Sequence, residues 1–306
     1  MINSYLKTAI RSITRKKSFT ILNVSGLATG IAAALIIFLV IRYELGYDTY
    51  QSKADRIFRV ITNVSNRSNG EIRDRLSTVP WELPQVMQQD FPGLEKTATI
   101  SSLGAAQIYV PAPDGASEKK FKQTGIFFTS PELYSIFDYT WLSGNATGLT
   151  APNTVVLSES IARAYFGDVT TTVGKTIQLW SYRVPLQVTG IFKDLPANTD
   201  IKVRLGISHA TLEKLAPGAF TGAYQWEAAD GNTQCFVLLK KKDNLAAVTA
   251  GLPAFVRRYY RGSSTRSTEL QLQPLANMHL NKQYHNFESG NLSSKELWAL
   301  GLIGAF

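Results

Sequence analysis

Residues 18–41 read SFTILNVSGLATGIAAALIIFLVI and contain no charged residue. A helix of about 20 residues, rising about 1.5 Å per residue, spans the roughly 30 Å hydrocarbon core of a bilayer. A signal peptide is the alternative, but its apolar core is shorter and small residues follow it at the cleavage point. Here the small residues come first and the run ends in the bulky residues 38–41. We therefore predict an uncleaved transmembrane helix over 18–41.

Positive charge is concentrated in front of this helix. The chain has 306 residues and a formal net charge of +9, and the first 17 residues hold five cations and no acid. Under the positive-inside rule, residues 1–17 lie in the cytoplasm and the chain from about Arg42 onward is exported. A basic end of this kind does not indicate a nucleic-acid-binding protein, and we expect no nucleic-acid partner.

The segment before the membrane helix has a helical pattern of its own. Apolar residues recur at helical spacing and the cations occupy other faces. This pattern predicts a basic amphipathic helix on the inner leaflet of the lipid bilayer; a solvated helix start is the alternative. The residues predicted to lie at the membrane surface are Leu6, Lys7, Ile10, Arg11, Ile13, Arg15, Lys16 and Lys17.

Two further features concern membrane helices. Gly26 and Gly30 form a G-x-x-x-G pattern inside the first span, and such a pattern permits close helix packing. The last ten residues, LWALGLIGAF, are apolar and uncharged. Because a free carboxylate inside a bilayer is costly, we interpret 294–306 as the start of a second membrane helix, truncated at the end of the sequence.

Residues 42–293 are expected to form one exported α+β domain, because strand-like and helix-like segments alternate irregularly along them. A loop at 141–153 is the expected boundary between two subdomains, the first of them completed by C-terminal strands. The expected strands include 56–64, 154–157, 176–180, 185–192, 234–240 and 268–275. The expected helices are 80–92, 130–137, 159–166 and one with Leu245, Val248, Leu252, Phe255 and Tyr259 on one face.

The stretch GDVTTTVGKT, residues 167–176, ends like a phosphate-binding P-loop. A P-loop needs its first glycine five positions before Gly174, where Val169 stands instead. Its flanks are also reversed, because a helix pattern precedes it and a strand pattern follows. We predict a helix cap at Gly167, a polar loop and the start of a strand, so this chain is not expected to bind ATP itself.

The residue types that carry catalysis or bind metals are scattered. His279 and His285 are six residues apart, a spacing that fits no standard metal pair, and His209 is remote from both. Cys235 lies in an apolar strand pattern, which indicates a buried, inert thiol. KDLPANTD, residues 193–200, is typical of a structured turn, with cation binding by Asp194 and Asp200 as the less favoured alternative. We expect no catalytic residue, no cofactor and no metal site, and hence no enzyme.

Several stretches, in order, resemble ABC transporter permeases of the MacB/FtsX type. The first runs from the basic helix through LN-x-x-GLA-x-G and YE-L-x-YD to RIFRV. The second comprises NTVVLSESIARAYFG, VGKTI and VTGIFKDLPANTD, which resemble the MacB-like periplasmic core domain. The third, LQLQPLANMHL, resembles the segment that leads this domain back to the membrane.

This resemblance implies a multi-pass permease of the bacterial inner membrane, with its main domain in the periplasm between helices one and two. A separate ABC ATPase would act from the cytoplasm on a permease dimer, homo- or heteromeric, with periplasmic or outer-membrane components as further partners. The movement of the ATPase would be passed through the membrane helices to the exported domains, where it would drive export or extraction of a substrate without opening a pore. The alternative is a membrane-anchored periplasmic module that senses or binds a ligand without ATPase coupling.

Overall fold

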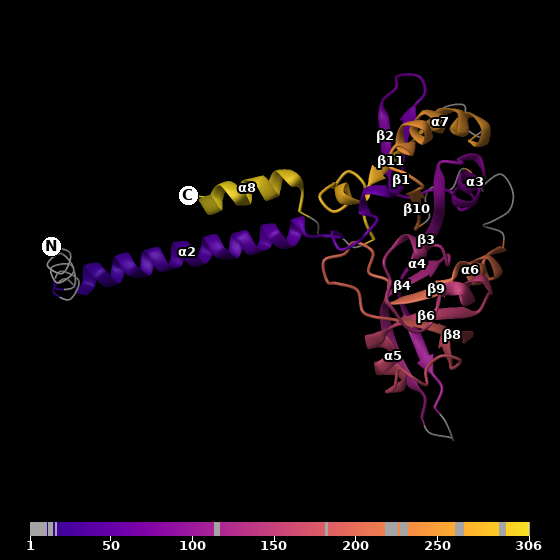
Figure 1. Ribbon diagram of the computed structural model, residues 1–306, viewed down its shortest axis with the longest axis horizontal. Coiled ribbons are helices and arrows are strands. Elements are labelled where there is room, and N and C mark those ends of the chain that lie inside the picture. The colour runs from indigo at the N-terminus through magenta and orange to yellow at the C-terminus, as the bar shows by residue number, and fades with distance from the viewer. Residues whose placement is uncertain are drawn as a thin grey trace. The chain divides into compact units, whose positions relative to one another are not determined.

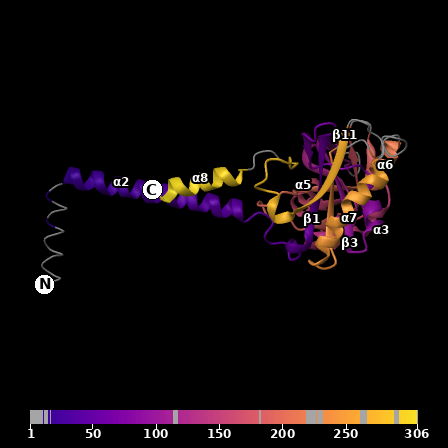
Figure 2. The same cartoon turned by 90° about the horizontal axis from the view of Figure 1, so that it is seen from above.

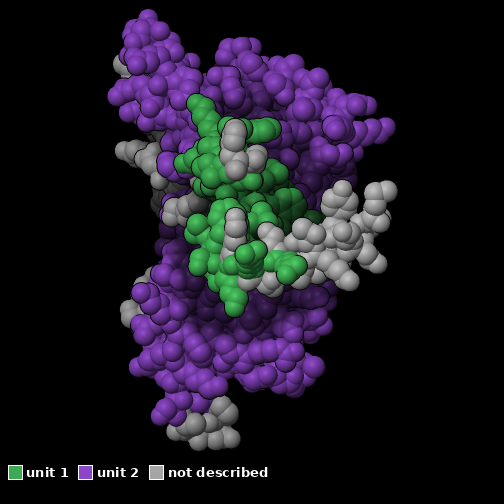
Figure 3. Space-filling model, turned by 90° about the vertical axis from the view of Figure 1, so that its left-hand side faces the viewer, with its two compact units in different colours: residues 1–46, 292–306 green, residues 47–291 purple. Residues whose placement is uncertain are grey.

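The computed structural model describes residues 11, 15, 17–112, 117–180, 183–217, 226, 232–260, 266–287 and 292–305 (Figure 1). The mixed α+β class is confirmed, with an apolar N-terminal helix followed by a sheet-rich domain. The chain divides into two compact units, residues 1–46 with 292–306 and residues 47–291 (Figure 3).

The apolar helix of the first unit is α2 (Lys17–Leu45), which is long and apolar enough to cross a membrane. It continues four residues beyond the expected end at residue 41. None of its described residues is buried, as a helix facing lipid requires. Arg11 and Arg15, from the predicted membrane-surface helix, are helical and exposed. Lys17, also predicted to lie at the membrane surface, begins α2. The other predicted residues of that helix lie outside the described ones: Leu6, Lys7, Ile10, Ile13 and Lys16.

The second helix of this unit, α8 (Ser294–Ala305), lies beside α2 in both views (Figures 1 and 2). A capping box fixes its start: the Ser293 hydroxyl accepts the N–H of Glu296 at 3.3 Å, and the Glu296 carboxylate accepts the N–H of Ser293 at 2.6 Å. A Cβ on Gly304 would lie 3.0 Å from the Ile37 side chain, so close packing at this contact depends on a glycine of α8. At Gly26 and Gly30, a Cβ would meet no described atom within 4 Å. Helix packing at these two glycines stays a prediction.

The second unit is built on an eleven-stranded sheet. Its order is β11-β1-β10-β3-β4-β9-β6-β8-β5, with β2 pairing with β1, and β7 with β3 and β8. The strands are β1 (Ile57–Asn66), β2 (Ile72–Leu76), β3 (Leu94–Val110), β4 (Lys119–Thr129), β5 (Trp141–Gly144), β6 (Thr154–Ser158), β7 (Thr176–Leu179), β8 (Val184–Phe192), β9 (Leu205–Ser208), β10 (Thr233–Leu239) and β11 (Arg266–Pro274).

Helices and short 3-10 turns complete this unit. They are α3 (Leu83–Asp90), α4 (Leu133–Ile136), α5 (Glu159–Phe166), α6 (His209–Leu215), α7 (Asn244–Tyr259), η1 (Ala54–Arg56), η2 (Ala146–Thr150) and η5 (Leu275–Asn277). The prediction of a loop over 141–153 is partly wrong, because this segment contains β5 and η2. The helix expected over 130–137 is reduced to α4. The sequence did not predict β2, β9 or α6.

Strands from distant parts of the chain lie next to each other. β1 pairs antiparallel with both β10 and β11, while β4–β9 and β6–β8 are parallel pairs. The long strand β3 contributes to three buried apolar clusters: through Leu94 to the one under α3 and α7, through Ile100 to the one around α4, and through Ile108 to the one under α5. It therefore connects the whole interior of the unit.

The stretch 167–176 has the geometry that the sequence predicts. Gly167 follows α5 with a φ of +81°, and its N–H donates to the carbonyl of Arg163 at 2.8 Å. Gly174 has a φ of +91° just before β7. Lys175 is exposed, and its ammonium lies 5.1 Å from the centre of the Phe166 ring. The helix before the motif and the strand after it are the reverse of a P-loop.

We predict opposite effects for two substitutions in this stretch. Lys175→Ala should change the free energy of unfolding by no more than about 0.5 kcal/mol, as is usual at a surface. Gly167→Val should cost about 1–2 kcal/mol or more, because a β-branched residue is poorly tolerated at positive φ. Thermal unfolding of the full chain in detergent micelles measures both. An equal loss of stability in the two variants would contradict the cap assignment.

Candidate functional site

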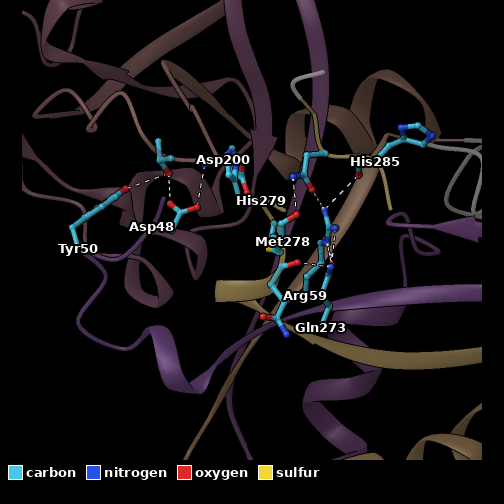
Figure 4. A network of polar contacts seen from close by, with 11 residues as sticks. Asp48, Tyr50, Arg59, Asp200, Gln273, Met278, His279 and His285 are labelled. Atoms are coloured by element: carbon cyan, nitrogen blue, oxygen red, sulfur yellow. Dashed lines mark hydrogen bonds and ion pairs between the residues drawn. The ribbon is translucent and has the colours of Figure 1, made fainter. Parts of the chain in front are cut away.

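Two segments connect the sheet unit to the helices of the other unit: residues 47–53 follow α2, and residues 275–287 precede α8. Both contact a buried polar cluster, which we call the junction network (Figure 4). Its members are Tyr47, Asp48, Tyr50, Arg59, Thr199, Asp200, Gln234, Gln273, His279 and Asn286.

Asp48 holds the first connecting segment. It is 4% exposed and has a φ of +53°, a conformation that aspartate tolerates better than most residues. Its carboxylate accepts the Thr199 hydroxyl and, at 3.1 Å, the N–H of Asp200. Its own N–H donates to the carbonyl of Asn198 at 3.1 Å. Three bonds therefore fix this segment to the turn that ends at residue 200.

The second connecting segment reaches the same turn through His279. Its Nδ1 lies 2.8 Å from Asp200 Oδ1, and both residues are buried. The imidazole also stacks on the ring of Tyr47, with 13° between the planes. The other oxygen of Asp200, Oδ2, has no hydrogen-bond partner among the described residues. The residues that follow α2 and those that precede α8 thus meet in one buried contact.

Arg59, the third residue of β1, is hydrogen-bonded to the second connecting segment. Its side chain is fully buried. Nε and Nη2 donate to Gln273 Oε1 at 3.1 and 2.7 Å, and Nη1 donates to Asn286 Oδ1 at 2.6 Å. Burial lowers the pKa of Arg59 to about 10, although the negative charge of Asp200 acts in the opposite direction. The guanidinium is therefore still charged at neutral pH, and neutral amide oxygens satisfy it.

The first connecting segment and η1 are also fixed to the start of β3. Lys53 donates to the carbonyl of Ser135 at 2.6 Å, and Lys96 of β3 donates to the hydroxyl of the same serine at 2.9 Å. Arg56 pairs with Glu95 of β3 at 2.9 Å. The first connecting segment and η1 are thus bound to α4 and β3 as well as to the network.

Asp48 gives the junction network a pH dependence. Burial raises its pKa from 3.8 to about 6, against the hydrogen bonds from Thr199 and Asp200, which lower it. A raised pKa in the folded state means that protonation favours folding. This contribution is fully present below pH 3.8 and is lost as the pH rises through about 6.

We therefore predict that the wild-type chain loses about 2–3 kcal/mol of stability, relative to Asp48→Asn, between about pH 4 and pH 7. Asparagine keeps an acceptor oxygen for the N–H of Asp200 and does not titrate. Urea unfolding of both proteins in micelles, at a series of pH values, gives the difference. Parallel curves for the two proteins would contradict a buried, titrating Asp48.

The titratable residues of the network are hydrogen-bonded to one another or to their neighbours. Among the described residues, no group of three or more His, Cys, Asp and Glu side chains is placed to hold a metal ion. Asp194 and Asp200 have different partners, since Asp194 accepts from Ser160 at the start of α5. Cys235 is buried in β10, and burial raises the pKa of its thiol. The arrangement holds two segments of chain that are distant in the sequence against one buried cluster.

The network was not predicted from the sequence, although several of its residues lie in the stretches that carry the family resemblance. Asp48 comes from YE-L-x-YD, Arg59 from RIFRV, Asp200 from LPANTD and His279 from ANMHL. The available signal was that these short stretches occur together in one order. Their contact in space could not be inferred from the sequence, because the network joins residues such as Arg59 and Gln273, which are 214 positions apart.

Comparison with known proteins places the fold. A domain of a permease-like protein from Porphyromonas gingivalis superimposes with a TM-score of 0.60 at 16% identity, covering 82% of this chain and 99% of that one. The periplasmic region of MacB from Actinobacillus actinomycetemcomitans gives a TM-score of 0.47 at 12% identity, with 71% and 88% covered. The extracellular domain of the noncanonic ABC-type transporter YknZ from Gram-positive bacteria gives 0.43 at 8% identity, with 70% and 99% covered.

No curated protein matches the sequence. The family of MacB-like periplasmic core domains matches residues 20–255, which is more than half of the chain. The match contains most of α2, the first connecting segment, Arg59 and the turn that ends at Asp200. The chain therefore belongs to the MacB-like periplasmic core domain family of ABC transporter permeases.

Proposed function

We propose that this chain is part of an inner-membrane permease that couples ATP hydrolysis by a separate cytoplasmic ATPase to movement of its exported domain, for export or extraction of a substrate. One observation carries the proposal: the two segments that adjoin α2 and α8 converge on the junction network, through His279, Tyr47 and Asp200. A displacement of either helix would reach this buried contact along one of the connecting segments. Family membership supports the transporter context.

Rigid attachment is what such coupling needs. Buried hydrogen bonds to charged groups are stronger than exposed ones, because little water competes for the partners. Asp48, Arg59 and His279 are each buried and hydrogen-bonded. We infer that movement of the helices is passed to the sheet through these three residues rather than absorbed by a flexible linker.

The test follows the exported domain during ATP turnover. A spin label at Asn69, an exposed residue between β1 and β2, reports the distance between two permease copies in lipid nanodiscs with the ATPase present. ATP is expected to shift this distance in the wild type. His279→Ala should reduce the shift while ATP hydrolysis continues. An unchanged distance in an ATP-hydrolysing wild-type complex would instead favour a binding module without ATPase coupling.

The orientation in the membrane is part of the proposal. The cations before residue 18 favour a cytoplasmic N-terminus, so residues 42–293 should lie in the periplasm. Alkaline phosphatase fused at Asn69 or Ser117, both exposed, should be active. Activity of a cytoplasmic reporter at either position would contradict this orientation.

Dimerisation is a further part of the proposal. Gly26 and Gly30 lie four residues apart on α2, and no described atom occupies the space beside them. A helix of a second permease copy, identical or homologous, can approach closely there. The lipid bilayer covers the apolar surface of α2 that neither α8 nor the second copy contacts.

A further inference from the structure

The edge strand β11 is open to pairing. It is the terminal strand of the sheet, and within the described chain it pairs only with β1. The pairing runs over nine residues without a register shift, and the one proline, Pro274, stands at its last position. A long, regular edge presents a row of backbone donors and acceptors to another strand. Neither a bulge nor an internal proline blocks it here.

A groove of about 1030 Å³ runs beside this edge, between β11 and α7. Its volume lies at the upper limit of the roughly 300–1,000 Å³ typical of small-molecule pockets. A groove of this size along a strand suits a segment of polypeptide better than a compact small molecule. Apolar and aromatic residues form much of its lining: Phe58, Leu245, Val256, Tyr260, Leu270 and Leu272.

Three arginines line the same groove. Arg266 begins β11, and Arg67 directly follows its register partner Asn66, so both lie at one end of the β1–β11 pair. Arg257 comes from the last turn of α7, on the opposite wall. Glu269 is the carboxylate among the lining residues, and it accepts a hydrogen bond from Gln271 at 2.8 Å. The lining therefore has an excess of positive charge, which attracts an acidic ligand.

We propose that β11 and this groove bind an extended, acidic peptide segment of an exported partner protein. The segment adds as a strand to the open edge of β11, places alternate apolar side chains in the groove and directs carboxylates to the arginines. This interaction goes beyond the proposed ATP coupling and does not depend on it. Binding is measured without the ATPase, so either proposal can fail alone.

The probe is a fluorescein-labelled peptide of alternating valine and threonine with glutamates at one end, titrated with the full chain in detergent micelles. Two versions are N-methylated on alternate residues, one along each edge of the peptide strand. An added strand uses only one edge to bond β11. One version should therefore lose affinity by about tenfold or more, while the other binds like the unmethylated peptide.

Adjacent arginines of α7 provide a matched pair of variants. Arg257→Ala should weaken binding about fivefold, since it removes a lining charge. Arg258→Ala removes the same charge from the next residue, which does not line the groove and pairs with Asp90 at 3.5 Å, and should leave affinity unchanged. Equal effects of the two variants, or equal losses with both methylated peptides, would overturn the proposal. Binding of oleate without binding of the peptide would also overturn it, and would assign the groove to an amphiphile.

Discussion

Replacing Arg59 by leucine is expected to destabilise the sheet unit by about 2–5 kcal/mol, because Gln273 Oε1 and Asn286 Oδ1 both lose their donor, at about 1–3 kcal/mol each. The guanidinium has no exposed surface, and it is the donor for Gln273 Oε1 and Asn286 Oδ1. Leucine leaves both oxygens buried without a donor and adds a cavity, and each change has a cost.

Chemical unfolding of the full chain in micelles measures this loss. Arg163→Leu is the control, because Arg163 is an exposed arginine of α5 that pairs with Glu159 at 2.8 Å. That variant should lose at most about 1 kcal/mol. Hydrogen exchange should also rise in residues 278–287, which Arg59 holds through Asn286. A stable Arg59→Leu chain with unchanged exchange in that segment would show that the junction network does not depend on this charge.

Gly144→Ala is expected to have a comparable effect, about 3–5 kcal/mol, for a different reason. Gly144 ends β5 and lies opposite Gly190 of β8. A Cβ on Gly144 would lie 2.1 Å from the carbonyl oxygen of Thr189 and 2.9 Å from the Cα of Gly190. Both neighbours are backbone atoms, so no side-chain rotation relieves the clash. The φ of +62° adds the strain that any L-residue meets in this region.

Gly104→Ala separates these two costs. Gly104 has a φ of +73°, but a Cβ there would meet no described atom within 4 Å. The Gly104→Ala variant should therefore lose only the stability that a positive φ costs an L-residue, about 1–2 kcal/mol. Denaturant unfolding of the two alanine variants gives the comparison: if their m-values agree, the difference between their midpoints measures the difference in stability. Equal losses would mean that the β5–β8 contact opens to admit a methyl group.

Elements with a clear period were predictable from the sequence. In β8, Leu186 and Val188 are buried and Gln187 is exposed, as period-two alternation predicts. In α7, Val248, Leu252 and Phe255 face the core at helical spacing. β9 was missed because its four residues are all buried and show no alternation, and β5 because its Ser and Gly are typical of a loop. Their place is set by neighbouring strands, not by local preference.

The junction network was beyond local reasoning for another reason. Arg59 lies between two apolar residues of β1, a position that in an isolated strand faces water. It is buried in the folded chain, and the hydrogen-bond partner Gln273 that satisfies it lies 214 residues away in the sequence. Asp200 and His279 are 79 residues apart, and neither forms a local motif with its neighbours. Only tertiary contacts turn these polar residues into one cluster.

The length of β3 has a mechanical consequence. Its first residues, Glu95 and Lys96, are bound to Arg56 directly and to Lys53 through Ser135, while its last residues pair with β4 and β7. Seventeen residues at about 3.3 Å each make an arm of roughly 55 Å. A tilt of about 5° at the held end then displaces the far end by about 5 Å, less whatever the irregular pairing around Gly104 absorbs. Under the proposed coupling, β3 would therefore convert a small rotation at its first residues into a larger displacement at its last residues.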